Sequence, residues 1–179
     1  MTASPFTLQQ NVQEHQGEAW IVEIAVGTMK RAQAEAWAAT FLLLGGRSNT
    51  FLFGDPAGTT ARGSVPGAPK VDGAGQTGRT LNTKGWTASQ TGVLLAGDWI
   101  QVGSGATQRL YKVTEDADSD GAGLAALSSW PRLRESPDDS ETLVVANCKG
   151  TFRLGSNTME WDIDASLFYQ TSFVAVEAI

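Results

Sequence analysis

The chain has 179 residues, with 13 basic and 19 acidic side chains and a net charge of -6. A chain of this length can bury one core or two small ones, which excludes a large multidomain enzyme. Lys and Arg never occur four or more in a row, so the sequence offers no basic stretch that would bind a nucleic-acid backbone. Apolar residues make up 41% and charged residues 18% of the chain, which is the composition of a folded globular protein.

Cysteine content and hydropathy indicate the cellular compartment in which the protein is assembled. Cys148 is the single cysteine, which excludes an intrachain disulfide and a thiolate cluster and is typical of a protein assembled in a reducing cytoplasm. We expect this thiol to be buried and inert. No run approaches the ~20 apolar residues that a membrane span needs, and residues 1–10 are polar. The sequence therefore predicts neither a membrane span nor a secretion signal.

The first predicted element is a half-buried strand over residues 18–26. Apolar and polar side chains alternate there, and one face carries Trp20, Val22, Ile24 and Val26.

A helix is predicted over residues 29–44. Thr28 is placed to cap its start, and Gly45 and Gly46 can end it in a left-handed conformation. Apolar side chains recur along one side at spacings of three to five residues, namely Met29, Ala34, Trp37, Ala38, Phe41 and Leu44. The many alanines favour a helix and give it a flat surface that can pack on a sheet.

Short strands dominate the rest of the chain. Residues 49–53 form a strand that Gly54 and Pro56 end, and residues 55–70 are rich in glycine and proline, which is typical of a connector. Beyond it lie short candidate strands separated by turn residues, at 77–81, 92–95, 98–102, 109–113, 122–127 and 143–146. This spacing predicts a small β-barrel or β-sandwich.

Alternation returns after residue 149 and predicts further strands near the C-terminus. The two strands before residue 54 would make only a marginal sheet, so we expect the C-terminal strands to complete it. The predicted plan is a discontinuous domain of residues 1–56 and 148–179, a connector of residues 57–64, and an inserted β domain of residues 65–147.

Several stretches, taken in order, resemble the small tail proteins of long-tailed, siphovirus-type bacteriophages, most closely the distal tail or tail-tip family. These are QAEAW at 33–37, GGRSNTFLFGDP at 45–56, GAGQTG at 73–78, LAGDWI at 95–100, LYKV at 110–113, WPRLR at 130–134 and MEW at 159–161. The resemblance covers about residues 5–179, and the order of the stretches is more specific than any one of them.

The resemblance implies a mainly β fold. Its expected parts are a tail-tube-like β-sandwich with one flanking helix and an inserted small β-barrel or sandwich domain. It also implies a virion protein without catalysis or cofactor, which forms a ring, expected to be a hexamer, and links the tail tube to the baseplate hub. The implied partners are the tube protein, the hub protein, the tape measure protein and the tail fibres, while phage DNA passes through the channel. The acidic net charge suits such a channel, because like charges prevent adhesion.

One alternative function is a host carbohydrate-binding module formed by the inserted domain. Exposed tryptophan is a common platform for sugar rings, and Trp86 and Trp130 lie beside Gly85 and Pro131 in predicted connecting regions. We therefore take these two as candidates for ligand stacking or subunit contacts. Trp20, Trp37 and Trp161 lie on apolar faces and are predicted to be core residues.

A weak calcium-loop pattern occurs at Asp116, Asp118 and Asp120, which Gly121 follows. Alternating carboxylates and a glycine open a calcium loop, but the twelfth position, which needs a bidentate glutamate, is Leu127. The competing interpretation is a solvated acidic loop, and we predict no resident metal.

Other candidate motifs lack their structural context. Gly73, Gly75 and Gly78 have dinucleotide-fingerprint spacing, but no helical pattern follows them, so turns beside a short strand are expected. His15 is the sole histidine, which leaves little basis for a catalytic triad. Glu160, Asp162 and Asp164 alternate along one strand, so they are expected to face solvent or an acidic lumen rather than flank a substrate.

Overall fold

The computed structural model describes residues 2–3, 10–11 and 17–179. Its strands are β1 (Thr2–Ala3), β2 (Gln10–Asn11), β3 (Ile21–Met29), β4 (Thr50–Phe53), β5 (Gly67–Val71), β6 (Thr80–Trp86), β7 (Trp99–Val102), β8 (Arg109–Val113), β9 (Leu124–Trp130), β10 (Gly150–Leu154), β11 (Asp162–Ile163) and β12 (Tyr169–Glu177). The helices are α1 (Arg31–Leu44) and the short 3-10 helix η1 (Gly105–Thr107). The predicted mainly β fold with one flanking α-helix is confirmed for the described residues. His15 lies outside them.

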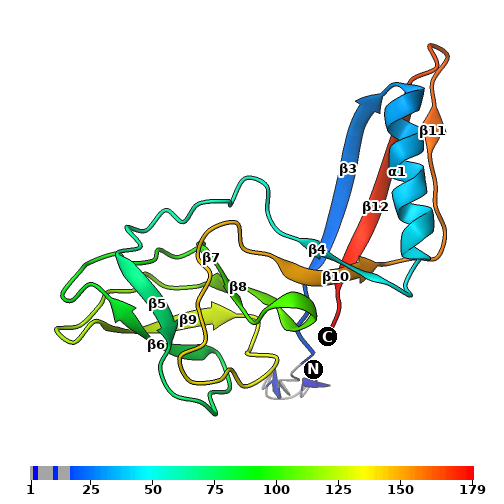
Figure 1. The fold of residues 1–179 in the computed structure, drawn as a ribbon. Coiled ribbons are helices and arrows are strands. Elements are labelled where there is room, and N and C mark those ends of the chain that lie inside the picture. The colour runs from blue at the N-terminus through cyan, green and yellow to red at the C-terminus, as the bar shows by residue number, and fades with distance from the viewer. Residues whose placement is uncertain (1, 4–9, 12–16) are drawn as a thin grey trace.

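One sheet joins strands from both ends of the chain. Its order is β11-β12-β10-β4, and β3 pairs with the other edge of β12. The long β12 is antiparallel to β3 from Tyr169 opposite Met29 to Val176 opposite Ile21. We call these strands together with α1 the sheet–helix unit. Figure 1 shows it as an arm in which α1 lies beside β3, β12 and β11.

The helix starts two residues later than predicted. Met29 still pairs with Tyr169, so Thr28 lies in β3, and the residue that precedes the helix is Lys30. The pairing of β3 with β12 thus extends the strand through Thr28, the expected cap of the helix. This pairing joins segments far apart in the sequence, so the local pattern could not predict it. The helix ends as predicted, because Gly45 takes the left-handed conformation at φ 61° and its N–H bonds to the carbonyl of Leu42.

The second sheet has the order β5-β6-β9-β8-β7 and curls into a half-barrel. We call residues 65–147, which contain it, the inserted unit. Its core is formed by fully buried side chains, the largest of which are Tyr111, Leu81, Leu94, Ile100, Leu127, Val71, Val93 and Val113. This unit buries its apolar side chains well: among the described residues of the unit, Leu124 is the large apolar side chain that stays exposed.

Several details of this sheet differ from the prediction. The strand predicted at 77–81 begins at Thr80 and extends to Trp86. β5 lies where the composition predicted the end of a connector. A strand that contains Gly67 and Pro69 can still pair with β6, because the register between the two strands is irregular there. The predicted strands at 92–95 and 143–146 form isolated bridges instead, Leu94 with Ala117 and Gln101 with Val144. Val93, Leu94 and Leu143 are buried in these runs, but the runs lack a continuous ladder.

Trp20 lies at the joint between the two units. Its ring is 5.0 Å from that of Trp99 and 4.4 Å from that of Trp130, in edge contact with the latter. Its indole N–H donates to the carbonyl of Leu110 at 2.9 Å. Cys148 is buried in the same cluster, where burial raises its pKa to about 12. The thiol is therefore in its neutral form, in agreement with the expectation of a buried cysteine.

Candidate functional site

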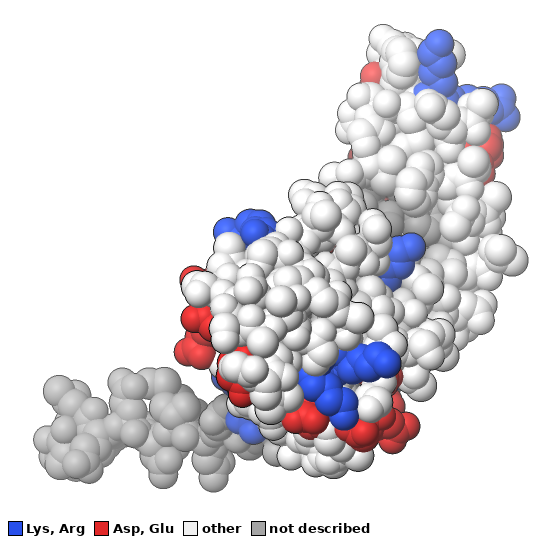
Figure 2. Space-filling model, turned by 60° about the vertical axis from the view of Figure 1, so that its left-hand side comes forward, with Lys and Arg blue, Asp and Glu red and all other residues white. Residues whose placement is uncertain are grey.

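Exposed apolar side chains gather on the sheet–helix unit. Among the described residues, those of this unit and its flanking segments are Ile21, Trp37, Leu42, Leu43, Leu52, Trp161, Ile163, Leu167, Phe168, Val174 and Ile179. Figure 2 shows the same contrast from one side: charged groups crowd over the lower body, while much of the arm is uncharged. Scattered exposed apolar residues are ordinary, but such a concentration on one unit makes it the candidate interaction surface.

An apolar groove runs between α1 and the β11–β12 hairpin. Its volume is about 510 Å³, and it is lined by Met29, Ala34, Glu35, Trp37, Ala38, Leu42, Met159, Trp161, Ile163, Tyr169, Gln170 and Thr171. Trp161 is 57% exposed, and Trp37, which stacks on Phe41 at 5.6 Å, is 38% exposed. The prediction that Trp37 and Trp161 are core residues was wrong. They lie on apolar faces, but Trp37 is covered only in part, by Phe41 and Phe173, and Trp161 is more than half exposed.

The outer edge of β3 is the second feature of this surface. β12 pairs with one edge of β3, and no strand in the described part of the chain pairs with the other. The strand is nine residues long with the sequence IVEIAVGTM, so Glu23 is its one charged residue and it has no lysine or proline. Natural proteins often place lysine or proline on a free edge to prevent pairing. A long edge without them is suited to pairing with another chain.

The two tryptophans proposed as contact residues are not free platforms. Trp86 is 5% exposed, and its indole N–H donates to Thr83 Oγ1 at 2.8 Å, so it belongs to the core of the inserted unit. Its position beside Gly85 suggested a loop, but β6 extends through Trp86. Trp130 is half-buried and packs against Trp20 at the joint. The burial of Trp86 corrects the expectation of an exposed contact residue there, while Trp130 stays a prediction with part of its ring exposed.

The aspartates of the calcium-like loop bind backbone amides. Asp116 Oδ1 accepts from Ala96 N and Asp118 Oδ1 accepts from Gly92 N, while Asp120 Oδ1 accepts two amides of its own turn. In the residues that the structure describes, no group of three or more potential ligands is arranged to hold a metal ion. Asp116 and Asp118 therefore fix the loop around residues 92–97 onto the 116–120 turn, and Asp120 shapes the turn that follows it.

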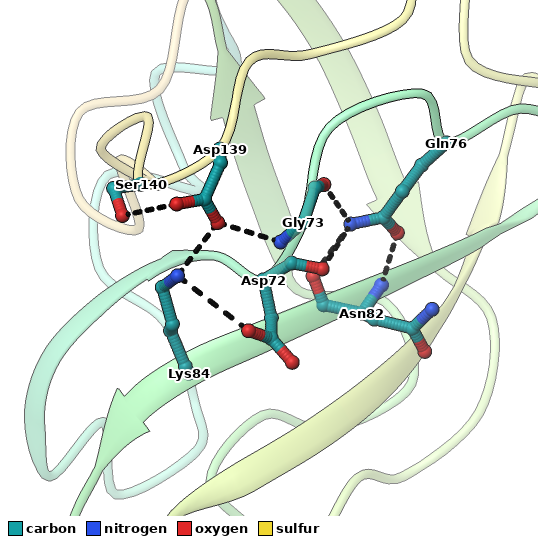
Figure 3. A network of polar contacts seen from close by, with 7 residues as sticks. All are labelled: Asp72, Gly73, Gln76, Asn82, Lys84, Asp139 and Ser140. Atoms are coloured by element: carbon teal, nitrogen blue, oxygen red, sulfur yellow. Dashed lines mark hydrogen bonds and ion pairs between the residues drawn. The ribbon is translucent and has the colours of Figure 1, made fainter.

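The glycine-rich loop at 73–78 is closed by side chains rather than open to a phosphate. Gly73, Gly75 and Gly78 all have positive φ, and β6 rather than a helix follows them. Gln76 closes the loop, because its amide group bonds to the carbonyls of residues 72, 73 and 82 and accepts from Asn82 N (Figure 3). The glycines serve the turn, and the dinucleotide interpretation has no helix to support it.

An ion-pair network ties this loop to the segment before β10. Asp139 Oδ1 accepts from Lys84 Nζ at 2.6 Å and from Gly73 N at 2.7 Å, and Asp72 is 3.5 Å from the same ammonium (Figure 3). The hydrogen bond to Asp139 raises the pKa of Lys84, and the hydrogen bond from Lys84 lowers the pKa of Asp139 well below its usual range. Both groups are therefore charged over the physiological range, as a structural clamp requires.

The alternating carboxylates of the C-terminal hairpin are exposed. Glu160 lines a cavity of about 240 Å³ that Glu23 also lines, whereas Asp162 and Asp164 do not line it. Asp164 Oδ1 accepts the amides of Ser166 and Phe168 and so shapes the turn between β11 and β12. Glu160 contributes its carbonyl to the hydroxyl of Thr171.

Sequence reasoning missed part of this surface. Leu42, Leu43, Leu167 and Phe168 are exposed, and the signal that could have identified the first two is the apolar run 41–44, which covers every side of the last helical turn. No pattern in the sequence indicated that Leu167, in the turn between β11 and β12, would be exposed.

Comparison with known proteins identifies no family. No protein-family model matches the chain, and no curated protein matches it significantly. None of the described helices is long and apolar enough to span a membrane.

Proposed function

We propose that this chain is a structural subunit of a bacteriophage tail tip, a distal tail or baseplate ring subunit that links the tail tube to the hub and fibres. The concentration of exposed apolar side chains on the sheet–helix unit, beside the free edge of β3, is the observation that carries this proposal. The ordered resemblance in sequence to tail-tip proteins supplies the biological setting.

The energetic argument favours assembly. Leaving one large apolar side chain in water forgoes about 1.5 to 3 kcal/mol of burial free energy. The sheet–helix unit leaves many such side chains exposed, including Leu42 and Leu43 on α1. Contacts with neighbouring copies would recover this free energy, and a permanent contact buries on the order of 1,600 Å² or more.

The sheet also has two different sides, as a ring built from head-to-tail contacts needs. β3 forms one side of the sheet, whereas β11 and β4 lie on the other side. Two different surfaces on opposite sides allow head-to-tail contacts, and such contacts generate closed rings when the rotation closes. Edge-to-edge pairing at β3 would continue the sheet from one copy to the next.

The inserted unit suits a position away from the contacts between copies. Its apolar side chains fill its own core, and its surface carries the charged groups visible in Figure 2. Hub and fibre proteins could then bind to this polar, outward unit. The net charge of -6 favours passage of DNA through the ring without adhesion.

The test uses the purified full chain and intact particles. We expect rings, with six copies, by light scattering and negative-stain microscopy, and labelling at the tail tip in micrographs of virions. A chain that stays monomeric at high concentration and is missing from the virion would overturn the proposal.

A further inference from the structure

A polar cleft of the inserted unit lies between the loop that joins β7 to β8 and the segment of residues 135–141. Val102 at the end of β7 pairs with Arg109 at the start of β8, so the cleft is at one end of the curled sheet. Its volume is about 150 Å³. The open ends of barrel-like sheets are common sites for small ligands.

Arg109 brings a guanidinium group to the inner face of this sheet. Tyr111 and Val113 of the same strand belong to the core of the inserted unit, and side chains alternate along a strand, so Arg109 lies on the core side as well. Arg109 is 8% exposed, and its terminal nitrogens donate to the carbonyls of residues 106 and 108 and to Glu135. Its Nε is buried without a partner among the described residues. A buried donor without an acceptor is destabilising, which a ligand oxygen in the cleft would relieve.

Tyr111 supplies a second unused donor. It is 2% exposed and lines the same cleft. Its phenol oxygen accepts from Arg134 N at 3.1 Å, while its own O–H donates to no residue that the structure describes. Burial raises the pKa of Tyr111, so the phenol keeps its proton at neutral pH. Two buried donors from one strand therefore line the cleft.

Carboxylates form the opposite wall. Glu135, Asp138 and Glu141 line the cleft. One oxygen of Glu135 accepts from Arg109, and one oxygen of Glu141 accepts from Asp138 N at 3.3 Å. The other oxygen of each glutamate and both oxygens of Asp138 have no donor within the described part of the chain. The cleft thus offers donors on one side and acceptors on the other.

This arrangement fits a neutral ligand that is rich in hydroxyl groups. Three carboxylates would repel an anion, whereas an organic cation would leave the donors of Arg109 and Tyr111 unpaired. A sugar hydroxyl both donates and accepts, so neighbouring hydroxyls of one ring can bond to both walls. The volume is below the roughly 300 Å³ of sites for drug-sized ligands, which matches a single sugar ring.

We infer that this cleft binds one sugar residue of a glycan, with the hydroxyl groups held between the donors of Arg109 and Tyr111 and the three carboxylates. The site lies wholly within the inserted unit, so it does not depend on the proposed ring. It also places carbohydrate recognition at a position other than Trp86 and Trp130.

The first test titrates free sugars into the purified full chain. The probes are glucose, galactose, mannose, rhamnose and N-acetylglucosamine, and heteronuclear NMR follows the Nε–H signal of Arg109. We expect a saturable shift of this signal with at least one sugar and none with sodium acetate or methylammonium chloride. A cleft that only closes the end of the sheet would bind none of the sugars, and a shift with acetate or methylammonium alone would show a different ligand class. Either result overturns the inference.

The second test alters the acceptor wall. Asp138 is exposed, so Asp138→Asn should leave the urea unfolding midpoint unchanged and weaken binding of the responding sugar roughly tenfold. Asp162→Asn is the matched control, since Asp162 is an exposed carboxylate of the sheet–helix unit, and it should bind like the unaltered chain. Glu141→Gln repeats the test on a second carboxylate of the cleft. Unchanged affinity in both cleft variants would overturn the site, and neither measurement depends on whether the chain forms rings.

Discussion

Arg134 of the inserted unit and Glu177 at the end of β12 form an ion pair that is almost completely buried. Arg134 Nη2 lies 2.7 Å from Glu177 Oε2, and the side chains are 6% and 1% exposed. Glu177 Oε2 also accepts the backbone amide of Trp20. One carboxylate thus connects the inserted unit, the segment before β3 and the last strand of the sheet.

Removing one partner of this pair should be strongly destabilising. Arg134→Ala leaves the buried carboxylate of Glu177 without its cation, which typically costs about 3 to 5 kcal/mol. The free energy of unfolding from urea titration measures the loss. The control is Arg31→Ala, since Arg31 and Glu35 form an exposed pair that contributes at most about 0.5 kcal/mol. Equal effects of the two substitutions would show that the Arg134–Glu177 pair does not stabilise the joint.

The Lys84–Asp139 pair predicts a pH dependence in acid. The pKa of Asp139 is lowered in the folded chain, chiefly by its hydrogen bond from Lys84. Its contribution to stability is therefore present above the unfolded value of about 3.9 and is lost as the pH falls toward the lower folded value. Urea midpoints measured from pH 6 to pH 2 should fall less steeply for Asp139→Asn than for the unaltered chain. Identical slopes would contradict the assignment.

The same pair predicts the opposite behaviour in alkali. The pKa of Lys84 is raised by its hydrogen bond to Asp139, so its contribution is present below about 10.4 and is lost as the pH rises through the folded value. The urea midpoint of Lys84→Met should therefore change less than that of the unaltered chain between pH 9 and pH 12.

Cys148 should be unreactive in the native chain. Burial raises its pKa to about 12, and its sulfur lies 3.3 Å from the carbonyls of Trp99 and Val144. A thiol-specific reagent at pH 8 is expected to label it only after denaturation, since the thiolate is the reactive form. Stoichiometric labelling within minutes of the folded chain would place the thiol at an accessible surface instead.

The free edge of β3 predicts a substitution that affects assembly but not folding. Ala25 is exposed on β3, so Ala25→Lys should fold normally and place an unpaired ammonium in the contact between copies. Sedimentation equilibrium should give an assembly roughly 100-fold weaker. Ala122→Lys, on an exposed turn of the inserted unit, is the matched control and should assemble like the unaltered chain. Normal assembly of Ala25→Lys would exclude this edge from the contact.

The sequence by itself determined the features that depend on local periodicity and backbone chemistry. Alternation over residues 18–26 identified β3, and the glycine at 45 marked the end of α1. Such signals are local because a strand has a period of two and a helix end needs a left-handed residue. The same patterns identified which face of the helix and strands is apolar.

Only the tertiary structure decided which apolar faces are covered. Trp86 is buried because β6 extends to it, whereas Trp161 stays exposed because no described segment of the chain covers it. The pairing of Arg134 with Glu177 joins residues 43 positions apart, and no local pattern encodes it. Burial depends on which distant segments pack together. The free energy of this packing is summed over the whole fold, so no single motif determines it.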